Sequence, residues 1–192
     1  MSQNNIRNGV NLNDLMAAIE AVKTDPGNGK LRFTVNSKWA GGFKAKHTTS
    51  GFTVGKETGR RAKNHTLTTD EPNEVLGSDT GISPAETLMS SLAACLTVGY
   101  AANAAALGID LDELSLEITG NGSLEGFMNL RNQRAGLSEL KIKAFIKSDA
   151  PAEKLQELHD YVNNHSPIWD TICNPVKIES QVVTHQPDHA HR

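Results

Sequence analysis

Apolar residues near the N-terminus recur three or four positions apart, a spacing that predicts a short amphipathic helix over residues 12–22. The members of this apolar row are Leu12, Leu15, Met16, Ile19 and Val22. The Pro- and Gly-rich stretch at 25–29 ends the helix. Residues 1–10 are polar and rich in Asn, and we expect them to be disordered.

Alternating apolar and polar positions predict strands in both halves of the chain. In the run 31–39, the residues Leu31, Phe33, Val35 and Trp39 fall on one face. The other expected strands lie at 43–46, 52–55, 65–69, 111–119, 140–146 and 176–183. A helix over 151–164 separates the last two of these strands.

The clearest helix signals surround residues 84–107. Ser83 can cap the helix, Pro84 suits its first position, and Glu86 completes a capping box. Gly108 provides the stop. Because this helix is rich in Ala and apolar on nearly every side, we expect it to be buried.

Strands and helices cluster along the chain more than they alternate, which favours an α+β fold. We predict an N-terminal extension with a short helix at 1–30, one domain at 31–184 and a disordered tail at 185–192.

Charge and composition exclude several classes of partner. A net charge of −3 and an aromatic content of 5% give no basis for nucleic-acid binding. We find no apolar stretch of the ~20 residues needed to cross a bilayer and no basic, apolar secretory start. We therefore expect a cytoplasmic protein without membrane contact. The histidines show no metal-ligand spacing, and we expect neither a metal nor a cofactor.

Two cysteines are the main candidates for chemistry. Cys95 lies in the long apolar helix, where a small apolar side chain filling the core is the simpler interpretation and a reactive thiol is the other. Cys173 precedes the last predicted strand and admits the same two interpretations. A structural disulfide between them is not expected in a reducing cytosol.

Two segments resemble the OsmC/Ohr superfamily. The first is DEPNEVLGSDTGISPAETLMSSLAAC at residues 70–95, with an acidic loop, a Gly-x-Asp turn and a Ser-Pro helix start before Ala-Cys. The second is HSPIWDTICNPVKI at residues 165–178. The resemblance covers about residues 31–183, and the N-terminal helix resembles an extension found in one branch.

This resemblance implies curved antiparallel sheets packed on a long, buried, cysteine-bearing helix, in an intertwined homodimer with sites at the subunit interface. It also implies thiol-dependent reduction of organic hydroperoxides. In that chemistry a cysteine thiolate becomes a sulfenic acid, and a second cysteine resolves it.

The family's functional residues carry over incompletely. Cys95 matches the peroxidatic cysteine, whereas Ser166 occupies the position of the resolving cysteine and Ala85 that of the catalytic Glu. Glu86 is the neighbouring candidate acid, although capping already explains it. The candidates for the activating arginine are Arg60 and Arg61, and Cys173 is a candidate substitute for the resolving cysteine.

Two functions therefore remain open. One is an OsmC-like stress-response peroxidase that acts on a small hydrophobic peroxide through Cys95 and uses an external thiol as reductant. The alternative is a non-enzymatic or divergent relative that binds a small hydrophobic ligand at the dimer interface.

Overall fold

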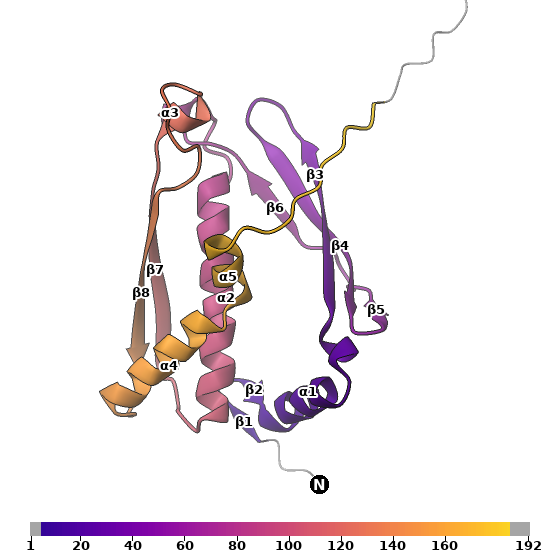
Figure 1. Cartoon of the computed structure of the whole chain (residues 1–192), viewed down its shortest axis with the longest axis vertical. Helices are drawn as coiled ribbons and strands as arrows, with labels where there is room; N and C mark the ends of the chain where they lie inside the picture. Colours follow the sequence, from indigo (N-terminus) through magenta and orange to yellow (C-terminus); the bar gives the residue numbers. More distant parts are fainter. Residues whose placement is uncertain (1–4, 185–192) are drawn as a thin grey trace, which may run out of the picture.

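A long central helix, α2 (Pro84–Ala106), stands between two antiparallel sheets in the computed structural model, which describes residues 5–184 (Figure 1). The sheet on one side is built from residues before α2, and the sheet on the other side from residues after it. The α+β class predicted from the sequence is confirmed.

The N-terminal segment forms a hairpin that contacts the far end of α2. β1 (Ile6–Arg7) and β2 (Val10–Asn11) pair around Asn8 and Gly9, whose φ angles are 51° and 76°. Asn-Gly is the preferred pair for such a turn. The Asn8 side chain donates to the Ile109 carbonyl at 2.9 Å and accepts from the Leu111 amide at 2.9 Å. The expectation of disorder is therefore wrong for residues 5–10. Residues 1–4 lie outside the described part of the chain.

The predicted N-terminal helix is present as α1 (Leu12–Thr24), followed by the short 3-10 helix η1 (Pro26–Gly29). The first sheet contains β3 (Leu31–Trp39), β4 (Ala45–Val54), β5 (Glu57–Gly59) and β6 (Thr66–Thr69), with β4 paired to the other three.

The two short strands expected at 43–46 and 52–55 are one strand, β4, because a register shift in its pairing opposite Phe33 and Val35 absorbs the irregular Ser50–Gly51 step. The apolar row of β3 exists as predicted, but it is open in the single chain: Phe33 is 61% exposed and Trp39 74%.

The loop between β6 and α2 is organised around one buried carboxylate, Asp70, which is 1% exposed. It accepts hydrogen bonds from the backbone amides of Glu71 (2.9 Å), Ser78 (3.2 Å) and Thr80 (3.1 Å), and from the Thr80 hydroxyl (2.8 Å). This loop includes the 3-10 helix η2 (Asn73–Val75). The predicted capping box follows: Ser83 accepts from the Glu86 amide, and the Glu86 carboxylate accepts from the Ser83 amide at 2.8 Å.

The second half of the chain supplies the core. β7 (Glu113–Asn121) and β8 (Glu139–Lys147) form a hairpin whose connection holds the single-turn helix α3 (Leu124–Phe127). α4 (Ala152–Asn164) and α5 (Pro167–Cys173) follow. The buried apolar residues of these elements and α2 form one cluster: Leu92, Leu96, Tyr100, Ala104, Ile109, Leu158 and Val162.

The prediction that α2 is buried holds for one side only. Leu96 and Tyr100 are fully buried, whereas Leu88 is 41% exposed, Val98 69% exposed, and Ala94 is also exposed. The reason is that β7, β8, α4 and α5 pack on one side of the helix and leave the other side open (Figure 1).

By length and composition alone α2 could cross a membrane, which corrects the expectation that no stretch approaches that length. Within the described chain its buried side packs against β7, β8, α4 and α5. The predicted last strand at 176–183 is also wrong. Residues 175–184 form no strand in the described chain, because no other strand lies beside them to complete a ladder. Val176 is 54% exposed and Ile178 83%. The expected disordered tail at 185–192 lies outside the described residues.

Asp70 should make folding stability depend on acidity. Burial acts to raise the pKa of its carboxyl, but the hydrogen bonds from Thr80, Glu71 and Ser78 outweigh it and hold the pKa below its usual 3.8. A lowered folded-state pKa stabilises the fold above pH 3.8 and loses that effect as the pH falls through the folded-state value.

We therefore expect Asp70→Asn to be less stable than wild type in urea unfolding at pH 7, with the difference shrinking below about pH 4. Asp79→Asn, a change to an exposed aspartate of the same loop, should behave as wild type. A constant difference between Asp70→Asn and wild type from pH 7 to pH 3 would contradict this role for the carboxylate.

Candidate functional site

The candidate site is the point where α5 meets α2. The Ser166 hydroxyl donates a hydrogen bond to the Cys95 sulfur at an Oγ–Sγ distance of 3.2 Å, across 71 positions of sequence. Cys95 is half-buried and Ser166 is 5% exposed. Figure 1 shows α5 beside the middle of α2. The two sequence segments that resembled one family are thus in contact.

Ser166 also begins α5. Its Oγ accepts from the Trp169 amide at 3.2 Å, and Pro167 occupies the first helical position, where it needs no hydrogen bond. The sequence analysis missed this helix. Its Ser-Pro start repeats the Ser83–Pro84 start of α2, and that signal could have revealed it.

The Ser166 hydroxyl can fill both roles at once. It has one hydrogen, which it donates to the Cys95 sulfur, and its lone pairs remain free to accept from the Trp169 amide. Of the described residues, only Ser166 hydrogen-bonds to that sulfur. The arrangement presents a thiol with one positioned donor, and hydrogen bonds to a charged acceptor such as a thiolate are stronger than those to a neutral one.

Glu86 does not contact Cys95 within the chain. It lies nine residues earlier on α2, or ~13 Å along the axis at the usual rise per residue. The hydrogen bond from the Ser83 amide, with a further contribution from the Ser83 side chain, lowers the pKa of the Glu86 carboxyl, so this side chain remains charged as part of the helix cap. Capping accounts for its position.

The two candidate arginines lie on the other sheet. Arg61 donates to the Ser50 carbonyl at 3.2 Å and lies 5.0 Å from the centre of the Phe52 ring, so β4 holds its guanidinium. Arg60 is exposed beyond β5. A single chain does not bring either arginine to Cys95.

Cys173 is exposed at the end of α5, whereas Cys95 contacts the beginning of that helix. Cys173 lies seven positions after Ser166, which corresponds to ~10 Å of helix. A disulfide requires Cα atoms within ~7 Å. Both thiols are free, and the exposed position of Cys173 contradicts its interpretation as a small apolar side chain that fills the core.

A second polar cluster lies further along α2. Tyr100 hydrogen-bonds to His159 Nδ1, and Asn163 lies 2.9 Å from the other ring nitrogen. Burial, together with the negative charge of Asp160, raises the pKa of Tyr100 to about 12. Tyr100 is fully buried, and the cluster satisfies its hydroxyl and the His159 ring, whereas the buried Asn163 Oδ1 accepts no hydrogen bond from the described residues.

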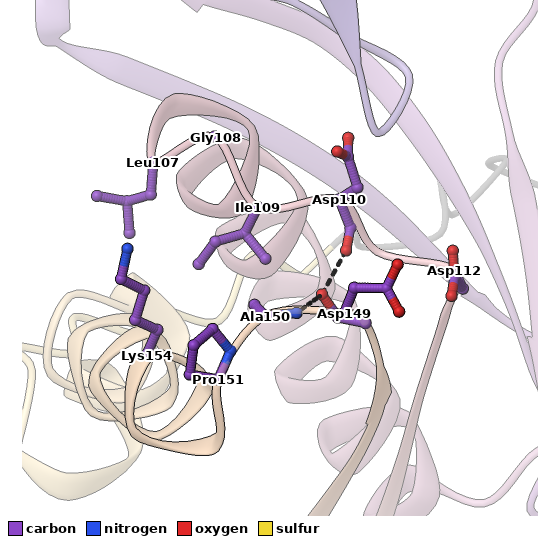
Figure 2. Close-up of a pocket in the computed structure, with 10 residues that line it drawn as sticks. Leu107, Gly108, Ile109, Asp110, Asp112, Asp149, Ala150, Pro151 and Lys154 are labelled. Carbon is purple, nitrogen blue, oxygen red and sulfur yellow. Dashed lines mark hydrogen bonds between the residues drawn. The ribbon is translucent and has the colours of Figure 1, made fainter.

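Two hollows of the surface lie at different distances from Cys95. One, of about 280 Å³, lies at the far end of α2 and is lined by residues 107–110, 112, 148–151 and 154 (Figure 2). Its carboxylates, from Asp110, Asp112 and Asp149, point in different directions. In the described chain no three His, Cys, Asp or Glu side chains are grouped to hold a metal. Leu107 is twelve residues from Cys95, or ~18 Å along the helix, so this hollow is remote from the thiol.

The other hollow, of about 680 Å³, lies between α2, β8, α5 and the loop before β8. It is mostly apolar, and its lining includes Leu92 and Trp169, each three residues from a member of the Cys95–Ser166 pair. We call it the α5 pocket. It is the better candidate for a ligand because apolar hollows with a few polar groups are typical of binding sites.

Solved structures with a similar fold support the architecture. One is an OsmC-like protein from Mycoplasma pneumoniae, with 21% identity and a TM-score of 0.55 over 77% of this chain and 90% of that one. Another, from Legionella pneumophila, is called an organic hydroperoxide resistance protein OsmC, with 15% identity and a TM-score of 0.51 over 73% and 88%. A third, from Psychrobacter arcticus 273-4, is described as an osmotic-stress-induced and detoxification response protein, with 18% identity and a TM-score of 0.57 over 74% and 88%.

No significant match was found among curated proteins. The sequence model of one family, described as OsmC-like protein, matches residues 77–181. This range holds more than half of the 192 residues, including both Cys95 and Ser166. The chain therefore belongs to the OsmC-like protein family.

Proposed function

We propose that this chain reduces organic hydroperoxides through Cys95 and that an external thiol regenerates the cysteine. The observation that carries the proposal is the hydrogen bond from Ser166 to the Cys95 sulfur. It places one directed donor on a half-buried thiol, next to a large apolar pocket that could hold the organic part of a peroxide. The hydroperoxide resistance proteins of similar fold favour the same chemistry.

The reaction has three steps. The Cys95 thiolate attacks the outer oxygen of a hydroperoxide, the O–O bond breaks, and the alkoxide takes up a proton and leaves as an alcohol. Cys95 is thereby oxidised to a sulfenic acid. An external thiol then condenses with the sulfenic acid, which forms a mixed disulfide and releases water. A second thiol restores the Cys95 thiol and leaves as an external disulfide.

The need for an external thiol follows from the residues that surround Cys95. Ser166 holds the place of a resolving cysteine but has no sulfur, and Cys173 lies at the opposite end of α5. A cytoplasmic location, which we also propose, would supply the reductant.

We further propose that the protein is an intertwined homodimer. Three apolar surfaces favour it: the open side of α2, the exposed row on β3, and the unpaired segment 174–184. Apolar patches of this kind usually mark interaction sites. A second subunit is also a source of a cation for Cys95, since Arg60 and Arg61 do not reach it within one chain.

The α5 pocket favours a second candidate function, binding of a small hydrophobic ligand without catalysis. In this case Cys95 is only a neighbour of the pocket. The two candidates differ in whether Cys95 is consumed and regenerated by peroxide and thiol.

Wild-type protein should consume cumene hydroperoxide when coupled to a dithiol, and Cys95→Ser should fall to the uncatalysed background rate. Cys173→Ser should retain activity close to wild type. Intact-mass analysis after peroxide without thiol should show additions of about 16 or 32 Da on Cys95, the steps of thiol oxidation. Equal rates for wild type and Cys95→Ser would leave only the ligand-binding candidate, and a Cys95–Cys173 disulfide would give Cys173 the resolving role.

The variant Ser166→Cys should form a disulfide with Cys95. The present Oγ–Sγ distance of 3.2 Å needs only a small closure to reach the ~2.05 Å of an S–S bond. Mild oxidation should remove about 2 Da, and closing a loop across 71 positions should stabilise the fold by up to about 4 kcal/mol. Cys95→Ser combined with Ser166→Cys is the control. A free thiol at both positions after oxidation would show that the two helices do not meet as described.

Sedimentation should give a mass near 41 kDa, twice the 20.7 kDa of one chain. Val98→Asp should convert the protein to a monomer, because it puts a charge on the open side of α2. Val98 is 69% exposed in one chain, so the subunit itself should still fold. Phe145→Asp, on the outer face of the β7–β8 hairpin, is the matched control and should stay dimeric. A wild-type mass near 20.7 kDa would exclude the dimer.

A further inference from the structure

A serine, a histidine and a threonine form a hydrogen-bonded row across β3, β4 and β6. His47 Nδ1 lies 2.7 Å from the Ser37 hydroxyl oxygen, and His47 Nε2 lies 2.9 Å from the Thr69 hydroxyl oxygen. Ser37 is exposed, His47 is half-buried and Thr69 is 6% exposed. The row lies on the sheet that precedes α2, and none of its residues lines the α5 pocket. It is therefore a second group of reactive side chains, separate from the Cys95 thiol.

The strand register brings Ser37 and His47 together. The two residues are directly opposite each other in the β3–β4 ladder. The Thr49 amide donates to the His65 carbonyl at 2.9 Å, so at Thr49 the backbone of β4 is directed away from β3. His47 lies two positions before Thr49, so the Ser37–His47 pair is of the same type, without backbone hydrogen bonds between its members. In such pairs the side chains are closest to each other.

The same alternation places an unpaired amide beside the serine. β3 is an end strand, and no strand of the described chain pairs with its outer edge. Because the backbone of Ser37 is not bonded to β4, its N–H and carbonyl groups point to that outer edge. Ser37 thus presents a hydroxyl on the face of the sheet and a hydrogen-bond donor at the edge.

Thr69 orients the imidazole. It pairs with Ala45 of β4 on one side and forms a parallel bridge with Ile82 on the other, so its backbone is held from both sides. When its hydroxyl accepts from His47 Nε2–H, the lone pair of Nδ1 is directed at the Ser37 hydroxyl. A nucleophile and a base within roughly 2.6–3.2 Å, with the base oriented by a third group, is the arrangement of an activated serine.

We propose that this row is a second catalytic site, which hydrolyses small carboxylic esters. Ser37 is the nucleophile, His47 is the general base and Thr69 is a positioning residue. Val35 and Trp39 lie on the same face as Ser37, two positions before and after it, and are 58% and 74% exposed. They offer apolar surface to an ester that approaches from the outer edge of β3. The proposal does not depend on Cys95.

The reaction proceeds through an acyl-serine. Ser37 Oγ attacks the ester carbonyl carbon, its proton passes to His47 Nδ1, and the Ser37 amide at the open edge stabilises the negative carbonyl oxygen. The bond to the leaving oxygen breaks, and His47 returns the proton to the alcohol that leaves. Water then attacks the acyl-serine and gives a proton to His47, which passes it to Ser37 Oγ as the carboxylic acid is released.

The probe is 4-nitrophenyl acetate, whose 4-nitrophenol product is followed by absorbance. The parent protein is the full chain with Cys95→Ser and Cys173→Ser, because a free thiol would also cleave this ester. The parent should react ~100-fold faster than its Ser37→Ala or His47→Gln variant, the lower end of what a positioned base contributes. Mass analysis of a quenched reaction should place an addition of about 42 Da, one acetyl group, on Ser37.

His65→Gln is the matched control for non-specific imidazole catalysis. His65 is exposed beside β4, and it binds Thr49 through its backbone amide and carbonyl. This variant should keep the rate of the parent. Thr69→Val should lower the rate, and Thr69→Ser should restore it, because serine keeps the hydroxyl that orients His47. Ser37→Cys should retain a nucleophile and become acetylated at the same position.

Equal rates for the parent and Ser37→Ala, an acetyl group on a residue other than Ser37, or equal losses for His47→Gln and His65→Gln would each overturn the proposal. The parent protein lacks both thiols, so these results and those of the peroxide assay can fail separately.

Discussion

The packing of one side of α2 is the constraint on which the other features depend. Leu92, Leu96 and Tyr100 are buried against β7, β8, α4 and α5. Burial of large apolar side chains of this kind is worth about 1.5–3 kcal/mol each. Because this contact fixes the rotation of the helix, it also decides that Cys95 meets Ser166 and that Val98 lies on the open side. The packing of α2 against β7, β8, α4 and α5 therefore determines both the core and the geometry of the candidate site.

At that interface, Ser166 determines which reactions are open to the Cys95 thiol. Ser166 caps α5 and donates to the Cys95 sulfur, and both roles are available to a hydroxyl. A sulfur at the same place would be a poorer cap and a better redox partner. A serine at this contact cannot form a disulfide with Cys95, so a redox cycle of Cys95 would need another thiol.

Local sequence signals predicted the elements that carry their own capping residues or a regular apolar alternation. The Ser83–Pro84–Glu86 start of α2 is a complete capping box, and the β8 alternation around Ile142 is regular. The same logic applied to Asn8–Gly9 and Ser166–Pro167 would have revealed the N-terminal hairpin and α5. The strand prediction for residues 176–183 was wrong for another reason. The apolar residues of this segment fit a strand, but a strand also needs a second strand to pair with. The Cys95–Ser166 contact and the α5 pocket depend on tertiary packing, which no local sequence pattern reveals.

The distribution of the core along the chain has a consequence for folding. Every residue of the buried apolar cluster, together with the partly buried residues packed on it, lies between Leu92 and Ile172. The sheet of β3–β6 contributes none of them. Units with few buried apolar contacts open first in native-state hydrogen exchange. In a single chain without a partner, the amides of β3–β6 should therefore exchange through local opening, while those of α2, β7 and β8 exchange only on global unfolding. The chain is thus divided into a cooperative unit, which contains Cys95, and a less stable sheet that precedes it in sequence.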